Sequence, residues 1–274
     1  MLRIVTWNIN SVRLRIDLLK DLVEKCNPDV VCLQETKCAN DQFPEKAIRK
    51  LGFDHFLVNG QKGYHGVATL SKKPLELVDQ RDFNGTEDAR HLAVSVNVGK
   101  TAKSNIIVHN FYVPAGGDIP DRDKNIKFGQ KLDFLTAMES WGIDMDKKAT
   151  SKHARMVLVG DLNIAPDEND VWSHKQLLKI VSHTPIEVEH LARVQEAHGW
   201  VDAVRKHVGP DETLFSWWSY RAKDWRASNR GRRLDHIWVT PKLHKTVKHV
   251  EVLDDVRGWE RPSDHAPIIM DLDV

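Results

Sequence analysis

The most constraining feature of the sequence is an apolar, β-branched run that ends abruptly in polar residues. Residues 156–159 lead into Gly160, Asp161 and Asn163, and Pro166 follows. Because residues i and i+2 of an extended chain share a face, Asp161 and Asn163 are expected to project together where the strand ends. Gly160 allows a turn or a close approach of the backbone, and Pro166 stops the strand. This pattern is typical of a catalytic strand end in an α/β enzyme, and an Asx turn that caps a core strand is the alternative.

Length and composition set limits on the fold. The chain has 274 residues, 41% of them hydrophobic, which is enough for the core of one large α/β or β-sandwich domain. No apolar run approaches the ~18 residues of a membrane span, and the N-terminus has the pattern of a strand and not of a signal peptide. The three cysteines form no CxxC motif, which argues against a disulfide framework or structural zinc and favours the reducing cytoplasm. We therefore expect one cytoplasmic, monomeric domain over residues 1–274.

The charge distribution is local and not global. The net charge is only +1, so no overall basic field announces a nucleic-acid partner. Residues 221–233 nevertheless contain six basic side chains and a single acid, Asp224, while the acids at strand ends are isolated. A basic rim around an acidic centre suits a metal-assisted site that acts on a polyanion. The aromatic run at residues 214–220 adds side chains that can stack on bases, and an aromatic core strand followed by a solvated loop is the alternative.

The first β-α-β unit is predicted to bring two polar side chains together. The N-terminal strand ends at Asn8, and a helix with Asn10 or Ser11 as its N-cap separates it from a buried strand at residues 29–34. That second strand delivers Glu35 at its end. If the two strands are parallel neighbours, Asn8 and Glu35 lie at the same sheet edge. A solvated loop residue is the alternative for Glu35.

The remaining periodicity predicts further helices and strands. Helices are expected at residues 41–51 and 124–141, an irregular helical stretch at 171–197, a polar loop at 144–155, and strands at 54–59, 66–71, 75–80, 92–98, 104–111, 233–239 and 268–272. Tyr112, Asp235 and the pair Asp264 and His265 lie at the ends of these strands. Taken singly, a Tyr before a Pro/Gly-rich break is usually a packing residue, and an Asp-His pair is more often a turn than a site.

Polar side chains at strand ends are the feature that these segments share. They are Asn8, Glu35, Tyr112, Asp161, Asn163, Asp235, Asp264 and His265. Several carboxylates in one place would repel and raise each other's pKa unless a cation lies among them. Hard oxygen ligands without a cysteine favour Mg²⁺ or Mn²⁺ over zinc. The sequence therefore predicts a divalent metal site.

Five motifs in chain order resemble those of the exonuclease III family. They are Trp-Asn-Ile-Asn at residues 7–10, Leu-Gln-Glu-Thr-Lys at 33–37, Gly-Asp-Leu-Asn at 160–163, Arg-Leu-Asp at 233–235 and Ser-Asp-His-Ala-Pro at 263–267. That family comprises abasic-site DNA endonucleases of the endonuclease/exonuclease/phosphatase superfamily. Each motif alone is weak, whereas five in order are specific. Residues 61–68 and 215–221 further resemble the exonuclease III branch, as opposed to sphingomyelinases or inositol phosphatases.

The resemblance implies both a fold and an activity. The fold would be a four-layered αββα sandwich of the deoxyribonuclease I type, an α/β architecture in which two mixed sheets pack face to face with helices outside. The activity would be that of a hydrolase of the exodeoxyribonuclease III or AP endonuclease type, acting in base excision repair. It would cleave the phosphodiester 5′ to abasic sites in duplex DNA. It would also act as a 3′→5′ exonuclease and would clean blocked 3′ ends as a phosphodiesterase or phosphatase.

The resemblance also implies a ligand set for the metal. Glu35 would be the principal ligand of Mg²⁺, with Mn²⁺ able to substitute, and Asn8 and Asp264 would lie in or near the same coordination shell. Asp161 and Asn163 could ligate a second ion. The number of ions stays open at this point.

Catalytic roles follow from the same motifs. By resemblance, Asp161 would orient and deprotonate the attacking water, and Asn163 would hold that water or a phosphate oxygen. His265 would donate to the phosphoryl oxygens, with Asp235 accepting from its other nitrogen. Tyr112 would hydrogen-bond the phosphate or help to stabilise the transition state.

Further residues are implied for DNA binding. Trp217, Trp218 and Leu234 would form an apolar pocket for the bare sugar of an abasic nucleotide, which costs less to flip because it has no base to unstack. Arg232 departs from the family pattern, because relatives tend to carry an apolar or aromatic residue there. This departure affects the shape of the pocket and the balance of endonuclease to exonuclease activity. Contacts to the DNA backbone would come from Lys62, Tyr64, Arg90 and the basic cluster at residues 221–233, which includes Arg221, Arg230 and Arg232.

Two alternative functions use the same residues differently. A superfamily phosphatase acting on a non-DNA phosphoester would use the same acids, base and metal. A non-catalytic DNA-binding module is the alternative from another class. The presence of every expected acid, amide and imidazole argues against that second alternative.

Overall fold

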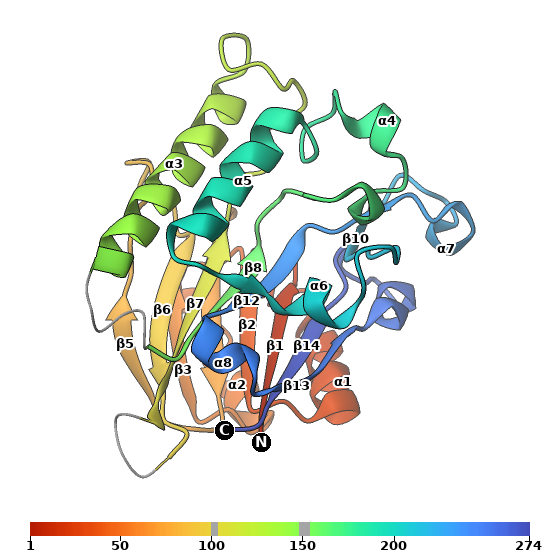
Figure 1. Ribbon diagram of the computed structural model, residues 1–274. Helices are drawn as coiled ribbons and strands as arrows, with labels where there is room; N and C mark the ends of the chain where they lie inside the picture. Colours follow the sequence, from red (N-terminus) through yellow and green to blue (C-terminus); the bar gives the residue numbers. More distant parts are fainter. Residues whose placement is uncertain (100–103, 148–153) are drawn as a thin grey trace.

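Two mixed six-stranded sheets lie at the centre of the computed structural model, which describes residues 1–99, 104–147 and 154–274 (Figure 1). The first sheet has the order β13 (Val247–Val252), β14 (Ile268–Leu272), β1 (Leu2–Asn8), β2 (Val30–Gln34), β4 (Val67–Ser71) and β3 (His55–Asn59). The second has the order β5 (Leu75–Asp79), β6 (His91–Val96), β7 (Ile106–Tyr112), β8 (Met156–Asp161), β12 (Asp235–Val239) and β9 (Val201–Asp202). A two-stranded ribbon pairs β10 (Trp217–Trp218) with β11 (Gly231–Arg232).

Helices cover the outer faces of both sheets (Figure 1). The first sheet is covered by α1 (Ile16–Cys26) and α2 (Glu45–Lys50), and the second by α3 (Ile126–Lys147) and α5 (Pro185–Ala197), which lie side by side. Shorter helices are α4 (His174–Leu177), α6 (Ala203–His207), α7 (Trp225–Ser228) and α8 (Pro241–His244), with 3₁₀ turns η1 (Asn40–Gln42), η3 (Glu168–Asp170) and η4 (Asp254–Gly258). This arrangement confirms the predicted αββα sandwich. In the part of the chain that the structure describes, no helix combines the length and apolarity needed to cross a membrane.

Strand alternation explains why two sheets pack together. In β1, Leu2 and Ile4 enter the core between the two sheets, whereas Val5 and Trp7 point to the other face and pack under α1. Successive side chains of a strand point to opposite faces, so a strand that is apolar throughout needs a cover on both sides. β8 follows the same rule, because its alternate residues pack against the first sheet and against α3 and α5.

The first helix begins later than the sequence predicts. Its N-cap was expected at Asn10 or Ser11, whereas α1 begins at Ile16. Asn10 and Ser11 have left-handed φ angles of 49° and 88°, and the N–H of Ser11 donates to the carbonyl oxygen of Glu35. This segment is therefore held across the end of β2, and its N–H groups are not available to start a helix.

Other differences concern the limits of elements. α3 continues to Lys147, beyond the predicted end at residue 141, so the expected loop at 144–155 begins as helix, and residues 148–153 lie outside the described part. β13 was not predicted, because only Val250 of its six residues is buried and the alternation is weak. The stretch at residues 171–197 contains two separate helices, α4 and α5.

A small polar network joins the two sheets beneath the edge where β1 and β2 end. Gln34 Nε2 donates to Thr6 Oγ1 (3.0 Å) within the first sheet and to Asn110 Oδ1 (2.7 Å) on β7 of the second. Asn110 Nδ2 donates in turn to the carbonyl oxygens of Leu33 (3.1 Å) and Ala68 (3.0 Å). Buried amides of this kind fix the relative position of two surfaces because a shift would leave them unpaired.

Two neutral histidines are buried on the outer side of the second sheet. His91 Nε2 and His109 Nδ1 lie 3.3 Å apart, and the rings pack against Phe111 and Trp141. Burial lowers the pKa of His109 to about 3 and that of His91 well below its usual range, with neighbouring positive groups adding to the effect. Both side chains therefore stay uncharged where histidine in an unfolded chain takes up a proton.

We predict that stability falls in mild acid because of His109. Its pKa is lower in the folded state, so the stabilisation is complete above the unfolded value of about 6.5 and is lost as the pH falls from there toward about 3. The loss for this one group is up to about 1.4 kcal/mol per pH unit. Chemical denaturation across this range should show a smaller slope for His109→Gln, whereas His249→Gln, at an exposed position, should keep the wild-type slope. Equal slopes for wild type and His109→Gln would contradict the prediction.

Candidate active site

Strand ends from both sheets meet at the edge of the sandwich that lies away from the chain termini (Figure 1). In the first sheet β1 and β2 run parallel, so Asn8 and Glu35 come to the same end. In the second sheet Tyr112, Asp161 and Asp235 stand in one row across β7, β8 and β12. The strand register therefore gathers these five polar residues on one edge.

A sharp turn after β8 presents Asp161. Gly160 has a φ of +139°, and a Cβ there would lie 1.9 Å from the carbonyl oxygen of Phe111, so a side chain does not fit. Asp161 Oδ1 accepts a hydrogen bond from the backbone N–H of Asn163 (2.9 Å), which is an Asx turn. Asn163 has a left-handed φ of 55°, and its Nδ2 donates to Asp161 Oδ2 (3.2 Å) and to Val113 O (2.9 Å). The Asx turn and the cluster of polar side chains, which the sequence offered as alternatives, therefore both occur in this segment.

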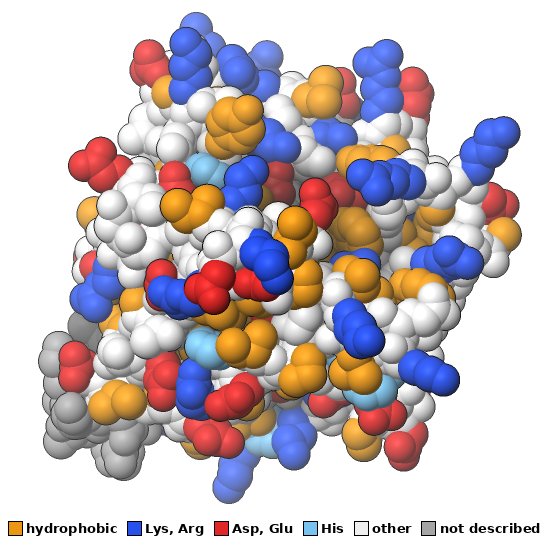
Figure 2. Space-filling view, turned by 90° about the horizontal axis from the view of Figure 1, so that it is seen from above, with side chains coloured by type: hydrophobic (Ala, Val, Ile, Leu, Met, Phe, Trp, Pro, Cys, Tyr) orange, Lys and Arg blue, Asp and Glu red, His pale blue; other side chains and the backbone are white. Residues whose placement is uncertain are grey.

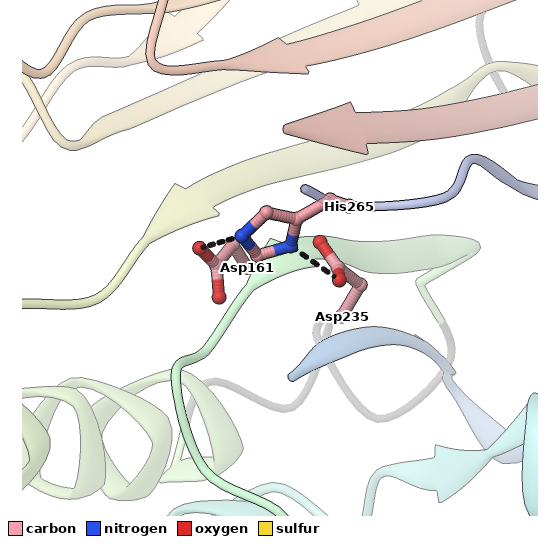
Figure 3. A group of neighbouring side chains, drawn as sticks. All are labelled: Asp161, Asp235 and His265. Atoms are coloured by element: carbon pink, nitrogen blue, oxygen red, sulfur yellow. Dashed lines mark hydrogen bonds and ion pairs between the residues drawn. The ribbon is translucent and has the colours of Figure 1, made fainter. Parts of the chain in front are cut away.

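A buried imidazole lies between two carboxylates (Figure 3). His265 Nδ1 is 2.8 Å from Asp235 Oδ2, and its Nε2 is 3.7 Å from Asp161 Oδ2. Ser216 Oγ donates to Asp235 Oδ2 (2.7 Å) and accepts from the backbone N–H groups of Asp235 and Leu234 (both 3.0 Å). The side chains of His265, Asp161 and Asp235 are at most 5% exposed. We refer to these three residues as the carboxylate–imidazole relay.

The relay shifts the pKa of His265 and that of Asp161. Burial acts against a charge on His265, but the carboxylates of Asp235 and Asp161 outweigh it and raise the pKa of the imidazole to about 10. Burial raises the pKa of Asp161 to about 7, with Asp235 adding to the rise and His265 opposing it. His265 is therefore a cation at neutral pH, and Asp161 is poised to take up a proton there.

Glu35 is the centre of a second cluster on the side of the first sheet. Its Oε1 accepts from Asn8 Nδ2 and from Tyr112 Oη, both at 2.9 Å, and its Oε2 pairs with Lys37 Nζ at 2.8 Å. Asn8 Nδ2 also donates to Asp161 Oδ2 (2.9 Å), which connects this cluster to the relay. Burial acts against the charge of Glu35, but Lys37 and Asn8 outweigh it and hold the pKa of the carboxyl below its usual range.

Asp264 completes the second cluster. Its Oδ1 accepts from Asn10 Nδ2 (3.1 Å) and its Oδ2 from Trp217 Nε1 (3.0 Å), while Asn10 Oδ1 accepts from Lys37 Nζ (2.6 Å). Burial disfavours its charge, but His265, Trp217 and Asn10 outweigh burial and lower the pKa of Asp264. Asp264 is thus an ionised group beside the reacting edge.

The donor atoms of the second cluster suit a hard divalent cation. Glu35 and Asp264 are ionised carboxylates, and the amide groups of Asn8 and Asn10 lie between them. Oxygen ligands of this kind, without sulfur, are those that Mg²⁺ takes in proteins. Glu35 and Asp264 are therefore the residues best placed to hold a metal ion, with Asn8 beside them.

The relay is a second candidate for metal binding. Ligand atoms of Asp161, Asp235 and His265 lie within 4.8 Å of one another, so this group could hold a metal ion. Both ring nitrogens of His265 face carboxylates, however, and its raised pKa keeps a proton on the ring. An imidazolium has no lone pair for a metal, so in this geometry the relay is better suited to hold a proton.

The residues implied for backbone contacts to DNA divide into two groups. Lys62, Tyr64, Arg221 and Arg230 are exposed. Figure 2 shows the face seen from above the view of Figure 1, where Lys and Arg side chains are spread with hydrophobic side chains between them. Arg90, in contrast, has a side chain only 8% exposed, and its Nε donates to Asp88 Oδ2 (3.0 Å). Its Nη1 donates to Tyr112 O (3.3 Å) and its guanidinium lies over the Tyr112 ring. Arg90 therefore supports Tyr112 from below the surface.

The residues implied for the apolar pocket do not all share one face. Trp217 and Leu234 pack in one cluster with Val171. Trp218 belongs to another cluster, with Phe215. Neighbouring residues of a strand point to opposite sides, so β10 directs one tryptophan toward Leu234 and the other away from it.

Arg232 forms part of the wall beside Trp217. Its guanidinium carbon lies 5.2 Å from the centroid of the Trp217 ring, and Nη1 donates to Val181 O (3.0 Å) and Ser182 Oγ (2.8 Å). The same Trp217 donates to Asp264. Arg232 therefore places a cation one aromatic ring away from Asp264, a metal-ligand candidate.

Several supporting residues were not singled out from the sequence. Asn10 and Lys37 lie inside two of the quoted motifs, where their contacts to Asp264 and Glu35 were not anticipated. Ser216 lies in the aromatic run, and the only available indication was a small polar residue among large apolar ones. Ser216 and Asp235 are nineteen positions apart, so their contact could not be predicted from the spacing in the sequence.

Comparison with known proteins was made for the whole chain. A sequence model of the endonuclease/exonuclease/phosphatase family matches residues 5–265. The chain is 33% identical to the exodeoxyribonuclease III of Haemophilus influenzae over 97% of this chain and 98% of that protein. An AP endonuclease structure from Archaeoglobus fulgidus covers 100% of both chains with a TM-score of 0.89 and 30% identity. A 3′ phosphatase from Neisseria, solved with product DNA hairpin bound, matches 100% of both chains with a TM-score of 0.86 and 28% identity.

We predict that the raised pKa of His265 depends on Asp235. After burial, which acts in the opposite direction, the Asp235 carboxylate is the main influence on the imidazole. In Asp235→Asn that charge is absent while the shape is kept, so the pKa of His265, followed by NMR of the imidazole, should fall from about 10. Ser216→Ala removes a hydrogen bond to Asp235 but keeps its charge, so the pKa should stay high. An unchanged pKa in Asp235→Asn would refute this account.

Proposed function

Because the chain belongs to the endonuclease/exonuclease/phosphatase family, and within it to the exonuclease III nucleases, we propose that it is a Mg²⁺-dependent DNA repair hydrolase. It cleaves the phosphodiester 5′ to abasic sites in duplex DNA. It also removes nucleotides in the 3′→5′ direction and clears blocked 3′ ends as a phosphodiesterase or phosphatase. Full-length similarity to an exodeoxyribonuclease III, an AP endonuclease and a 3′ phosphatase supports each of these activities.

The observation that carries this proposal is the carboxylate–imidazole relay beside the Glu35 cluster. A phosphodiester anion resists attack, so a site must activate water, hold it in line and neutralise developing charge. Asp161 takes the proton of the attacking water, and the new P–O bond forms as the bond to the 3′ oxygen breaks; the 3′ oxygen leaves as an alkoxide and takes a proton from solvent water. The His265 cation donates to the phosphoryl oxygens, and Asp235 keeps the imidazole charged and oriented.

Two further side chains hold the reacting groups. Asn163 presents its amide beside Asp161 Oδ2 and keeps the water or a phosphate oxygen in place. Tyr112, whose pKa is raised by burial and by Glu35 and Asp161, keeps its phenolic proton, and its O–H turns from Glu35 Oε1 to hydrogen-bond a phosphate oxygen when the substrate binds. Both groups are fixed by a backbone or side-chain partner, which suits a pre-organised site.

Glu35, Asp264 and Asn8 would hold Mg²⁺, or Mn²⁺ as a substitute. A bound ion would supply polarisation of the phosphoryl oxygens and would offset their charge. Asp161 and Asn163 stay available as ligands of a second ion. The positive charge of the ion would then offset the negative charges of the clustered carboxylates.

Recognition of the lesion uses the apolar side chains of Trp217 and Leu234, which pack in one cluster. A bare deoxyribose fits against them, while a nucleotide with a base needs more room. Arg232 places a positive charge beside Trp217, so it tunes the balance between abasic-site cleavage and exonuclease activity. Lys62, Tyr64, Arg221 and Arg230 are exposed and contact the DNA backbone.

The compartment and assembly state are also proposals. Cys26, Cys32 and Cys38 are free and buried, as suits a reducing compartment. We therefore place the protein in the cytoplasm, where it acts as a monomer in base excision repair.

A duplex with one tetrahydrofuran abasic analogue tests the function and predicts the role of Asp161. With Mg²⁺ the wild type should cut once on the 5′ side and leave a 3′ hydroxyl, and EDTA should abolish the cut. Asp161→Asn should fold normally and lower kcat by about 10²–10⁴, the range for a lost general base. Near-normal turnover in that variant would remove Asp161 from this role. Hydrolysis of p-nitrophenyl phosphate with the duplex left intact would favour the phosphatase alternative.

We predict that Glu35→Ala weakens the binding of Mg²⁺ most. Loss of this carboxylate removes the best-placed oxygen ligand, so the affinity measured by isothermal titration calorimetry should fall by at least about tenfold. The Mg²⁺ concentration needed for half-maximal cleavage should rise in parallel. Asp254→Ala, at an exposed position on η4, is the matched control and should bind Mg²⁺ as the wild type does. An unchanged titration for Glu35→Ala would overturn the assignment.

A further inference from the structure

A fully buried ion pair lies directly behind the catalytic turn. Lys131 of α3 and Glu187 of α5 have side chains with 0% exposure, and Lys131 Nζ is 2.6 Å from Glu187 Oε1. Burying two charges is expensive, and an apolar pair of similar volume often stabilises a fold as well or better. Simple packing of α3 on α5 therefore does not account for these two residues.

The Lys131 ammonium also binds the backbone of Asn163, and this contact connects the ion pair to the site. Lys131 Nζ donates to the backbone carbonyl oxygen of Asn163 at 2.8 Å and reaches Ala115 O at 3.4 Å. The charge-assisted bond to Asn163 is stronger than one between neutral groups. It acts on the same residue that carries the side-chain amide beside Asp161.

Glu187 extends the connection to the segment before α5. Its carboxylate accepts from the N–H groups of Ser182 (2.9 and 3.0 Å) and Thr184 (3.1 Å) and from Thr184 Oγ1 (2.7 Å). The carbonyl oxygen of Ser182 in turn accepts from the N–H of Ala165 at 2.8 Å. The ion pair therefore holds residues 163–165 at both ends, because Lys131 binds the Asn163 carbonyl directly and Glu187 acts on Ala165 through Ser182. We refer to these contacts as the clamp.

The conformation of Asn163 is one that needs such a clamp. Its φ of 55° lies in the left-handed region, which a non-glycine residue keeps only when its surroundings hold it. In this conformation its Nδ2 lies 3.2 Å from Asp161 Oδ2. Rotation of the peptide carrying the Asn163 carbonyl would move this amide away from the carboxylate.

We propose that Lys131 is a positioning residue for the nuclease reaction, which holds the Asn163 carbonyl and thereby keeps the Asn163 amide beside Asp161. Glu187 keeps the ammonium charged and aimed at that carbonyl. This inference rests on the proposed function, because it assigns Lys131 an effect through Asn163. A purely structural ion pair would affect folding but not the turnover of folded enzyme.

The test removes the pair without leaving an unpaired buried charge. Lys131→Met alone would strand the Glu187 carboxylate and could prevent folding, so the variant combines Lys131→Met with Glu187→Gln, whose amide oxygen can still accept from Ser182 and Thr184. Folded protein is confirmed by thermal unfolding. With the abasic duplex, kcat should fall about 10- to 100-fold, as for an angstrom-scale misplacement, while KM stays within about twofold because Lys131 does not touch the substrate.

Two controls make the result specific. Arg3→Met with Asp271→Asn neutralises another ion pair, at the opposite end of β1, and should leave kcat unchanged. Asn163→Ala should lower kcat, and adding the Lys131 and Glu187 changes to it should lower kcat by less than about twofold more, because residues that act through one another are not additive. A further full 10- to 100-fold loss, the range expected for an angstrom-scale misplacement, would show that Lys131 does not act through Asn163.

The outcomes separate this inference from the proposed function. Wild-type protein that leaves the abasic duplex uncut would overturn the proposed function itself. An active wild type together with a folded, fully active Lys131→Met/Glu187→Gln variant would overturn only the role of Lys131. Loss of kcat in that variant, absent in the Arg3 and Asp271 control and absent on the Asn163→Ala background, would establish it.

Discussion

The cost of burying charge is the constraint on which the rest of the structure depends. β8 and β12 pair so that Asp161 stands opposite Asp235, which sets two carboxylates side by side in the interior. Such a row is tolerable only when a cation lies between them, and His265 supplies it from the segment before β14. That segment contacts both sheets, because the carbonyl oxygen of His265 accepts from Trp7 Nε1 of β1 at 3.0 Å and its Nδ1 lies 2.8 Å from Asp235 Oδ2 of β12. Packing of the two sheets therefore also places the cation of the site.

The site is divided between the two sheets, so their packing sets its geometry. Glu35 belongs to the first sheet and Asp161 to the second, and Asn8 Nδ2 donates to both at 2.9 Å. The contact between Gln34 and Asn110 fixes the sheets just beneath this bridge. A sliding of one sheet over the other would break these buried amide bonds together, which costs more than the loss of apolar contact alone. The rigid strands thus fix the distance between Glu35, the candidate metal ligand, and Asp161, the candidate base.

The sequence predicted the features that depend on the alternation of side chains along a strand and on the order of the motifs. The polar ends of β1, β2, β7 and β8 and the turn at Asp161 follow from alternation and from Gly160, whereas the αββα layers were implied by the resemblance of the ordered motifs to the exonuclease III family. The start of α1 could not be predicted, because Asn10 and Ser11 are held by the end of β2, a contact made across the fold. Arg90 looked like a surface cation for a similar reason, since its partner at Tyr112 is twenty-two positions away. Lys131 and Glu187, fifty-six positions apart, have ordinary helix positions in sequence and acquire meaning only when α3 and α5 pack.

Ser182 contacts both the wall beside Trp217 and the turn at Asp161, so these two parts of the candidate site share one support. Its N–H binds Glu187, its carbonyl oxygen binds Ala165 in the turn, and its hydroxyl binds Arg232 in the wall. Its φ of 90° is unusual for a serine, and three partners on different elements hold it there. The segment before α5 offers Arg232 Nη1 both a carbonyl and a hydroxyl oxygen beside the aromatic wall, whereas Arg232 Nε is buried without a hydrogen-bond partner. Arg232 is thus bound to the same segment that supports Asn163, and the wall beside Trp217 and the turn at Asp161 are parts of one hydrogen-bonded unit.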